Sequence, residues 1–564
     1  MKLPGHQCLG IVCFVPLNPN DPKFFGFAEY LASLALMVLA WTTADVRYQF
    51  RVRTAPLPLI PITYGIVAGV GALTLLTDLW RAAGWLVPEG HLLTPEIWQA
   101  LLGLCFLATF LAWAWFAFVS PQKYGRFNYL RYGNALYRIV LKGAASELAI
   151  IADEITKSVP SLIRHATEFG RNERDQVDRR TPISACADDL LLLIADKRFC
   201  RAVVESSPDT ALTLFQVIAK TSKYRVRVGT FARNLVAVAL ANPDSFLFHE
   251  GEGYESGFLG YYKPLTQAIF GNYHMVEAIG TPLDAHPEYS APASQWKAYC
   301  RIAQITFRDY VKTGHGQHSF VLFRALGYIE GATMDLYVLD KSTLSLVGSN
   351  EYEKLVAAMN FVVLAIAALD EHGVPAHLKW RVRENDAPMR TTFYDHLAKL
   401  LFEIIFHASH VQAPASLCWS IHHNCVWGEL FNFDRLNSAA GKVIKFKLRR
   451  LLHDEIVGME KFENFKGAKI LAFCLNVMGI DAKPSRYDRD SWPLKKTVLS
   501  WTKRNFASLY ANNPRVGETC LVDSIAYDEK NCRLVKTYPI FVDPEPRRVY
   551  FDLDPAAVRA GHAA

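Results

Sequence analysis

The stretch FFGFAEYLASLALMVLAWTTA, from Phe24 to Ala44, decides how the rest of the chain is organised. Its only charged residue is Glu29, close to the start. About 20 mostly apolar residues in a helix cross a hydrocarbon core roughly 30 Å thick. Two more apolar stretches of this length follow, at 57–79 and 97–119. We therefore expect a three-helix transmembrane domain at 24–119, with spans at 24–44, 57–79 and 97–119.

Two other interpretations of these stretches fit less well. Buried core helices of a soluble protein usually keep a polar stripe, and these stretches have none. A cleaved signal peptide needs a basic start and a small-residue cleavage site, whereas the first apolar run begins only after Asn18-Pro19-Asn20-Asp21-Pro22. The triplet Thr94-Pro95-Glu96 before the third stretch is a typical helix start, with a capping hydroxyl, a first-turn proline and an acid.

The basic residues between the stretches predict the orientation. The first loop carries Arg47, Arg51 and Arg53, and the second carries Arg81 alone. Loops rich in Lys and Arg stay in the cytosol. We therefore expect a multi-pass protein of a bacterial-type inner (cytoplasmic) membrane, with residues 1–23 as an extracytoplasmic tail and the large C-terminal part in the cytosol.

A small-residue motif lies in the second stretch. Gly65 and Gly69 form G-x-x-x-G, which lets a neighbouring helix approach closely and pack. We expect this packing within the three-helix set, with pairing between two copies of the chain as the alternative and a homo-oligomer as its consequence.

The rest of the chain has helical periodicity up to about residue 514. We expect a juxtamembrane helical connector and charged linker at 120–180, an α-helical cytosolic domain at 181–514 and a small β element with the C-terminal tail at 515–564. Helices are expected at 184–206, 209–221, 227–241, 264–279, 295–312, 319–330, 351–371, 391–411, 438–457, 465–478 and 492–511. Met334 to Leu346 is expected to form a short hairpin, and alternating polarity after residue 515 predicts a β-hairpin with a third strand.

A glycine-rich segment and a histidine-rich segment are the candidate binding sites. The first, HEGEGYESGFLGYY from His249, brings together His249, Glu250, Glu252, Tyr254 and Glu255, whose carboxylates would attract a cation or a basic peptide. The alternative is a structural loop whose aromatic side chains fill the core. The second offers His407, His410, His422 and His423 as candidate metal ligands, although their spacing matches no zinc motif and the apolar neighbours favour a buried core.

Motifs for catalysis are sparse. The dipeptide His453-Asp454 resembles that of HD-type phosphohydrolases, in which histidines and aspartates hold metal ions, but Glu455-Ile456-Val457 depart from that pattern. The chain has no Walker A, G-x-S-x-G, H-E-x-x-H or Rossmann glycine motif, so we assign no catalytic or cofactor-binding residue. Eleven cysteines without a C-x-x-C pair suit a reducing cytosol.

The net charge of +7 is modest and lies largely in the juxtamembrane loops, which favours anionic lipid headgroups over nucleic acid as partners. The leading hypothesis is a non-enzymatic sensor, effector or anchor whose cytosolic helical domain binds a cytosolic protein or ligand and couples it to the lipid bilayer. The alternatives are a membrane-tethered metal-dependent hydrolase and an oligomeric channel or transport component.

Overall fold

The computed structural model describes residues 7–9, 12–17, 23–42, 45–89, 94–169, 181–250, 255–256, 260–261, 264–313, 318–339, 346–373, 392–432, 437–483, 490–538 and 546–555. The chain divides into two compact units, Met1–Leu235 and Val236–Ala564. The division falls inside helix α12 (Gly229–Ala241). Both units are mostly helical.

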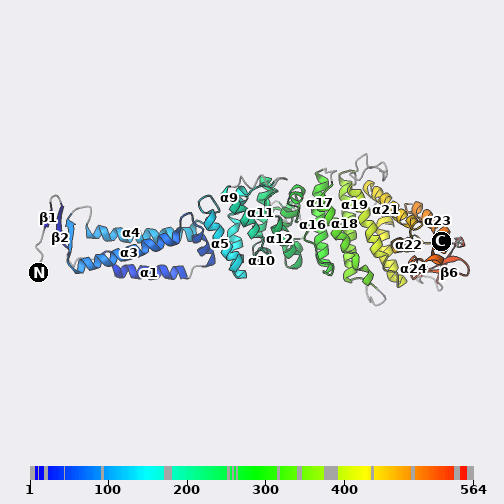
Figure 1. The fold of residues 1–564 in the computed structure, drawn as a ribbon, viewed down its shortest axis with the longest axis horizontal. Coiled ribbons are helices and arrows are strands. Elements are labelled where there is room, and N and C mark those ends of the chain that lie inside the picture. The colour runs from blue at the N-terminus through cyan, green and yellow to red at the C-terminus, as the bar shows by residue number, and fades with distance from the viewer. Residues whose placement is uncertain are drawn as a thin grey trace, which may run out of the picture. The chain divides into compact units, whose positions relative to one another are not determined.

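Apolar helices run side by side in the N-terminal part of the first unit (Figure 1). They are α1 (Phe27–Thr42), α3 (Leu59–Ala82) and α4 (Pro95–Ala114), and α4 continues into the π-type turn η1 (Trp115–Val119). Helix α3 has 24 residues and α4 with η1 has 25, so both are long and apolar enough to cross a membrane. The stretches expected at 57–79 and 97–119 are thus confirmed as continuous helices of membrane length.

The first apolar stretch gives a shorter helix than expected. Helix α1 has 16 residues and is therefore about 24 Å long. Its start is delayed because the backbone N–H of Gly26 donates to the Glu29 carboxylate at 3.0 Å. Two residues earlier, the N–H of Phe24 donates to the side-chain carbonyl of Gln99 at 3.0 Å. These bonds hold residues 24–26 outside the helix. Within the stretch expected at 24–44, the described helix is therefore Phe27–Thr42, and residues 43–44 lie outside the described residues.

The packing of α1 on α3 is centred on Gly71. A Cβ at Gly71 would lie 2.6 Å from the ring of Tyr30, so only glycine fits there, and the Tyr30 hydroxyl donates to the carbonyl of Val67 at 3.1 Å. At Gly65 and Gly69, by contrast, a Cβ would meet no described atom within 4 Å. The close helix contact expected at these two glycines is therefore made at Gly71 in the described part of the chain.

A small antiparallel sheet lies at one end of α3 and α4. It consists of β1 (Gln7–Leu9), β2 (Val12–Pro16) and β3 (Leu86–Glu89), in the order β1-β2-β3. Strand β3 follows α3, and Val15 of β2 is paired with Val87. The sequence predicts only a tail before the first helix, because two such short strands carry too little periodicity.

The remaining helices of the first unit are short. They are α2 (Val46–Arg53), α5 (Tyr129–Lys142), α6 (Ala145–Thr156), α7 (Val159–His165), α9 (Pro182–Leu193), α10 (Lys197–Ser206) and α11 (Pro208–Thr221). The single helix expected at 184–206 is two, because the Asp196 carboxylate caps a new helix by accepting from the N–H of Arg198 at 2.9 Å. The last part of the connector and charged linker expected at 120–180, residues 170–180, lies outside the described residues.

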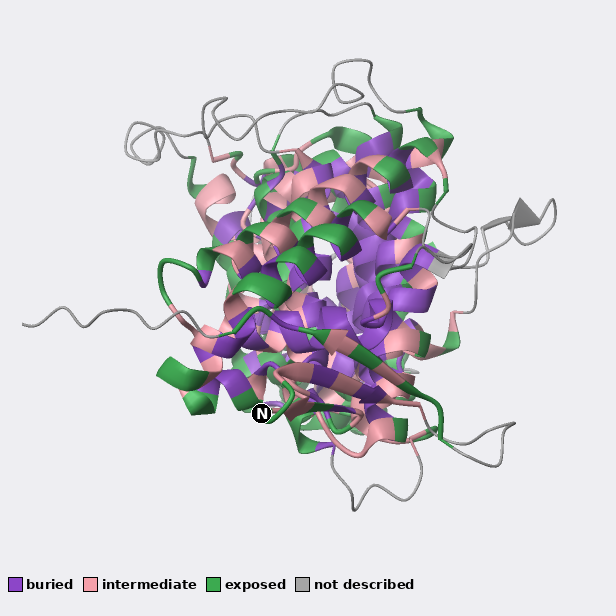
Figure 2. Cartoon of the chain, turned by 90° about the vertical axis from the view of Figure 1, so that its right-hand side faces the viewer, coloured by how far each residue is buried: buried purple, intermediate pink, exposed green. Residues whose placement is uncertain are grey.

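The second unit is built on helices of very different lengths, and many of their residues are buried (Figure 2). They are α13 (Phe246–His249), α14 (Pro264–Phe270), α15 (Tyr273–Ile279), α16 (Ala293–Lys312), α17 (Phe320–Gly331), α18 (Asn350–Glu371), α19 (Phe393–Ala408), α20 (Ala415–Trp419), the π-type helix η5 (Ser420–Asn432), α21 (Ala439–Gly458), α22 (Phe465–Met478), α23 (Trp492–Asn512) and α24 (Pro514–Thr519). Between 264 and 279 the expected single helix is again two, since the Asn272 side chain accepts from the N–H of Met275 at 3.0 Å and caps α15.

Strands are few in the second unit. The C-terminal sheet is antiparallel, in the order β6 (Ile525–Asp528), β7 (Arg533–Thr537) and β8 (Arg548–Asp552), which confirms the hairpin and third strand expected there. A second, two-stranded sheet pairs β4 (Glu255–Ser256) with β5 (Gly260–Tyr261). The first part of the hairpin expected at 334–346 is instead a 3₁₀ turn, η2 (Met334–Val338), and residues 340–345 lie outside the described residues. The Asp335 carboxylate of this turn pairs with the buried ammonium of Lys354.

Candidate functional site at the base of the apolar helices

The short helix α2 is tied to α6 by a buried ion pair. The Arg51 guanidinium donates from Nε to Glu154 Oε2 at 2.8 Å and from Nη2 to Glu154 Oε1 at 2.6 Å. Its Nη1 donates to the carbonyl of Ala117 in η1 at 3.1 Å. Arg51 is 8% exposed and Glu154 is 4% exposed. One side chain thus joins the loop between α1 and α3, the end of α4 and the helix α6.

Neighbouring charges reinforce this pair. Arg47 Nη2 donates to Asp153 at 2.9 Å, and Lys157 Nζ donates to Glu154 Oε1 at 3.1 Å. Burial favours the neutral form of Glu154, but the hydrogen bonds and charges of Arg51 and Lys157 outweigh it, so the pKa of this carboxyl lies below its usual value. Glu154 is therefore a buried carboxylate that stays charged at neutral pH.

The turn between α2 and α3 is held from the other side by α5 and the residues before it. The Asn128 amide donates to the carbonyl of Thr54 at 2.7 Å. The Arg131 guanidinium donates to the carbonyl of Ala55 at 3.0 Å and also to that of Pro56. Since carbonyls in a turn have no helical partner, these donors satisfy groups that would otherwise be unpaired. Together with the Arg51–Glu154 pair they form what we call the junction.

A basic pocket opens beside the junction. It has a volume of about 210 Å³ and lies between the end of α2, the first turn of α3 and one face of α5. Three arginines line it, Arg53, Arg131 and Arg138, together with Asn134. Arg53 and Arg138 are exposed, and among the described residues neither has an ion pair. The arginine charges of this pocket are therefore not neutralised by a carboxylate of the described chain.

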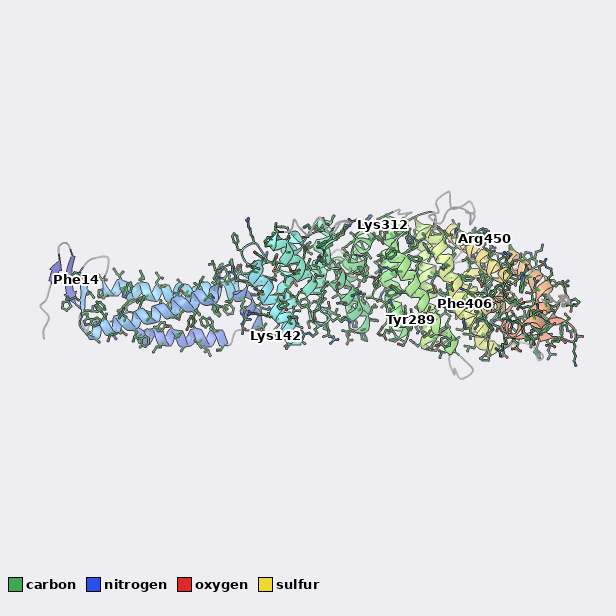
Figure 3. The ribbon with its side chains drawn as sticks, viewed as in Figure 1. Phe14, Lys142, Tyr289, Lys312, Phe406 and Arg450 are labelled. Atoms are coloured by element: carbon green, nitrogen blue, oxygen red, sulfur yellow. The ribbon has the colours of Figure 1, made fainter. Side chains whose placement is uncertain are left out.

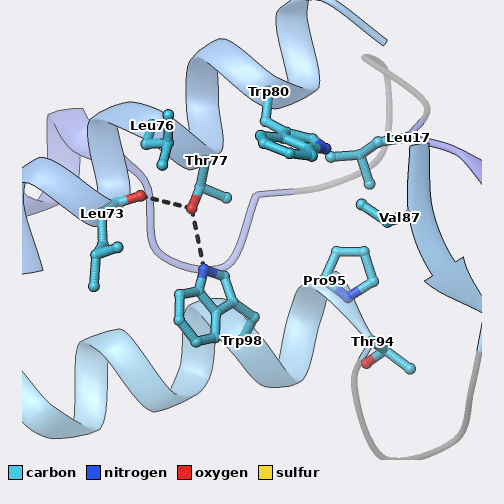
Figure 4. Close-up of a pocket in the computed structure, with 9 residues that line it drawn as sticks. All are labelled: Leu17, Leu73, Leu76, Thr77, Trp80, Val87, Thr94, Pro95 and Trp98. Atoms are coloured by element: carbon cyan, nitrogen blue, oxygen red, sulfur yellow. Dashed lines mark hydrogen bonds between the residues drawn. The ribbon is translucent and has the colours of Figure 1, made fainter. Parts of the chain in front are cut away.

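An apolar pocket lies at the opposite end of α3, near the strands. It has a volume of about 280 Å³ and is lined by the last turns of α3, the start of α4 and β3 (Figure 4). The indole N–H of Trp98 donates to Thr77 Oγ1 at 3.1 Å, and that of Trp80 donates to the carbonyl of Leu86 at 3.2 Å. Because these polar groups already have partners, the pocket offers apolar surface to an occupant.

The four histidines expected as metal ligands point to separate partners. His407 Nδ1 lies 2.9 Å from Thr333 Oγ1, and His410 packs edge-on against the ring of Phe406, which Figure 3 labels. His423 stacks on Trp419 at 4.1 Å between ring centres. Among the described residues, no three His, Cys, Asp or Glu side chains converge as metal ligands would. His453 and Asp454 contact each other at 2.9 Å on the exposed side of α21.

His422 belongs to a buried polar cluster that the sequence did not predict. Its Nε2 lies 2.9 Å from the carbonyl of Ala408, and the amide of Asn476 contacts His422 Nδ1 at 3.1 Å and Cys418 Sγ at 3.2 Å. The ammonium of Lys536 donates to the carbonyl of Leu475 at 3.3 Å. The contacts join η5, α22 and β7, which are distant in sequence, so no local spacing could have revealed them.

Burial governs the chemistry of this cluster. It raises the pKa of the Cys418 thiol to about 12 and lowers that of His422 to about 3. It also lowers the pKa of Lys536 to about 7. A reactive cysteine needs a lowered pKa and access to solvent, and Cys418 is 1% exposed. The Cys-His-Asn combination is therefore a satisfied polar core, which holds the C-terminal sheet against α22.

The glycine-rich segment is described only in part. Glu250 accepts from the N–H of Leu265 at 3.1 Å and of Thr266 at 2.8 Å, so it caps α14. His249 is exposed, 3.9 Å from Asp244. Glu252 and Tyr254 lie outside the described residues, and Glu255 is placed as backbone in β4, paired with Tyr261.

In the sequence, Arg51 indicates only the orientation of the first loop, and its partner Glu154 was not predicted. A signal was present in the sequence: Glu154 lies between two apolar residues, Ala152 and Ile155, which are both buried. A charged residue beside buried apolar positions needs a partner. No protein-family model, no curated protein and no solved structure matches this chain.

Proposed function

We propose that this is an integral membrane protein of a bacterial-type inner membrane whose cytosolic helical domain binds a cytosolic protein or ligand and passes that event to the bilayer through the junction. Helices α1, α3 and α4 lie in the membrane, with the N-terminal tail outside. The role is that of a non-enzymatic sensor, effector or anchor. The observation that carries the proposal is the buried Arg51–Glu154 pair, which locks the loop between two apolar helices onto α6.

Membrane placement is supported by where the apolar surface lies. Only 33% of the most apolar window of α3 and 22% of that of α4 is buried, whereas 61% is buried in α18, which is of similar length and apolarity. Helix α18 is covered by protein, chiefly by α16. The exposed leucines of α3 and α4, such as Leu79 and Leu104, would form a large apolar patch in water. In a bilayer they would contact the apolar acyl chains of the lipids.

Coupling is supported by the rigidity of the connection. A bidentate Arg–carboxylate contact fixes both distance and orientation, and here it is buried and continued by Arg47, Asp153 and Lys157. A tilt or shift of α3 or α4 in the bilayer would therefore move α6 with it. A flexible tether would need no such contacts.

Placement is tested by cysteine labelling in intact cells, in a variant without reactive native cysteines. A membrane-impermeant maleimide should label Ala83→Cys, at the end of α3, and should leave Lys142→Cys, at the end of α5, unlabelled until the membrane is broken. The reverse pattern would contradict the orientation.

Coupling is tested by amide hydrogen exchange of the full chain in nanodiscs of short-chain and long-chain phosphatidylcholine. Lipids of different thickness tilt membrane helices to different degrees. Exchange in α6 should differ between the two lipids in the wild-type protein, and the difference should vanish in Arg51→Met/Glu154→Leu. If α6 exchanges identically in both lipids in the wild type, the junction does not transmit the state of the membrane.

A further inference from the structure

The basic pocket has the shape and charge of a receptor for a phosphate group. Arg131 and Arg138 are seven residues apart on α5, with Asn134 between them, so all three lie on one face of that helix. Arg53, from α2, completes the lining. Three guanidinium groups around a cavity of about 210 Å³ match a phosphate, whose oxygens accept from the paired N–H groups of arginine.

The charge of the pocket is held in place and is left without a partner. Arg131 is held by the carbonyls of Ala55 and Phe127, which accept from its Nε and Nη2 without cancelling its charge. Arg51 on the same short helix as Arg53 is neutralised by Glu154. Helix α2 therefore separates arginines that build the fold from one that is available to a ligand.

The other wall of the pocket is apolar and begins a membrane-length helix. Leu59, Ile60 and Pro61 of the first turn of α3 line it, and Ile60 is 54% exposed. A phosphate held by the arginines would have apolar surface next to it, running along α3. Free phosphate makes no use of that surface, whereas a phospholipid does.

We infer that the basic pocket binds the headgroup phosphate of an anionic phospholipid in the cytosolic leaflet, with the acyl chains along the start of α3. Basic pockets at the cytosolic ends of membrane helices recognise such headgroups. The inference rests on the proposed membrane placement and adds a defined lipid site to it. Lipid bound there contacts α2, α3 and α5, the same elements that meet at the junction.

The test is a titration of the full-length protein in neutral detergent micelles with rising mole fractions of phosphatidylglycerol, followed by native mass spectrometry. Arg53→Gln/Arg138→Gln removes two pocket charges but leaves the carbonyl contacts of Arg131 intact. Each basic side chain near an anionic lipid surface contributes a factor of about five, so the loss of two should weaken lipid binding roughly 25-fold. Arg126→Gln/Lys142→Gln is the matched control, because it removes the same charge from exposed positions outside the pocket; Lys142 is labelled in Figure 3.

The control variant should retain most of the binding, and phosphatidylcholine should bind far more weakly than phosphatidylglycerol. Equal losses in the two double variants would mean diffuse attraction and would overturn the pocket. Displacement of the lipid by millimolar inorganic phosphate would assign the site to free phosphate instead. Melting temperatures of all variants exclude unfolding as the cause of a loss.

The lipid site and the coupling through the junction can be refuted independently of each other. A wild-type protein that binds no phosphatidylglycerol overturns the lipid site even where α6 still responds to bilayer thickness. An α6 that does not respond overturns coupling and leaves the lipid site standing.

Discussion

Replacing Arg51 with methionine should destabilise the first unit strongly, because it leaves a buried charge without its main partner. Glu154 would keep the Lys157 ammonium at 3.1 Å and the Arg47 guanidinium at 3.6 Å, but it would lose both bonds of the bidentate contact. Breaking a buried ion pair in this way costs about 3–5 kcal/mol. The two remaining cations place the expected cost at the lower end, about 3 kcal/mol.

The matched control is Arg53→Met, two residues further along the same helix. Arg53 is exposed and makes no ion pair with a described residue, so its replacement should change the free energy of unfolding by less than about 0.5 kcal/mol in lipid-free detergent. For a unit of 235 residues, about 3 kcal/mol corresponds to a fall in melting temperature of roughly 6–12 °C.

The assay is thermal unfolding of the full chain in detergent, with hydrogen exchange of α6 to confirm that the first unit is affected. The double variant Arg51→Met/Glu154→Leu should recover most of the lost stability, because a buried pair replaced on both sides by apolar groups is often neutral. The pair does not hold the junction if Arg51→Met has the same melting temperature as Arg53→Met. The same holds if the stability lost in the double variant equals the sum of the losses in the two single variants.

The same pair predicts the response to acid. The pKa of Glu154 is lower in the folded protein than in the unfolded chain, so its stabilising effect is present above the ordinary carboxyl pKa and is lost as the pH falls through the lowered one. Stability of the wild type should therefore fall more steeply with acid than that of Arg51→Met/Glu154→Leu. Parallel pH profiles of the two proteins would refute this part of the reasoning.

Three further predictions concern packing and buried ionisable groups. Gly71→Val should cost about 1–3 kcal/mol in detergent, because its side chain meets the ring of an α1 tyrosine, while Gly65→Val should leave the melting temperature unchanged; equal effects would contradict the packing described for α3. His422→Ala should cost about 2–5 kcal/mol through the loss of a fully buried ring. The variant should also lose less stability between pH 6.5 and about 3, where the unfolded histidine takes up a proton and the folded one does not. An unchanged acid profile would show that His422 is not held neutral. Lys536→Met should reduce the rise in stability between pH 7 and 10.5. The folded pKa of Lys536, about 7, lies below the unfolded value, so the stability that this group contributes is present only at high pH. A wild-type slope in the variant would refute the burial of this ammonium.

Local signals in the sequence predicted most helix ends. The expected start at Thr94-Pro95-Glu96 is confirmed, since Thr94 caps α4 by accepting from the N–H of Ile97 at 3.3 Å. Hidden caps were missed: Asp196 and Asn272 each begin a new helix inside a stretch that apolar periodicity alone makes continuous. The capping residue is visible in the sequence, but the break becomes clear only when its acceptor oxygen is seen to bond the next turn.

Contacts between distant residues could not be predicted in the same way. Glu154 and Arg51 are 103 residues apart, and Asn476 is 54 residues from His422. No period links such pairs, because their approach depends on how whole helices pack. The same limit applies to the glycines of α3, since the motif at Gly65 and Gly69 cannot show which side of the helix faces α1.

The three arginines of the first loop illustrate how one charge pattern serves several ends. Counting them predicts only that the loop stays in the cytosol. Helical geometry then divides them: Arg47 and Arg51 are four residues apart and both reach α6, whereas Arg53 is rotated about 200° from Arg51 and lines the basic pocket. A lipid phosphate at Arg53 would thus lie on the opposite side of α2 from Glu154. Because α2 has only eight residues, a displacement of Arg53 would also displace Arg51. Occupancy of the pocket and strength of the junction should therefore be coupled: phosphatidylglycerol should slow exchange in α6 of the wild type and have no such effect in Arg53→Gln/Arg138→Gln.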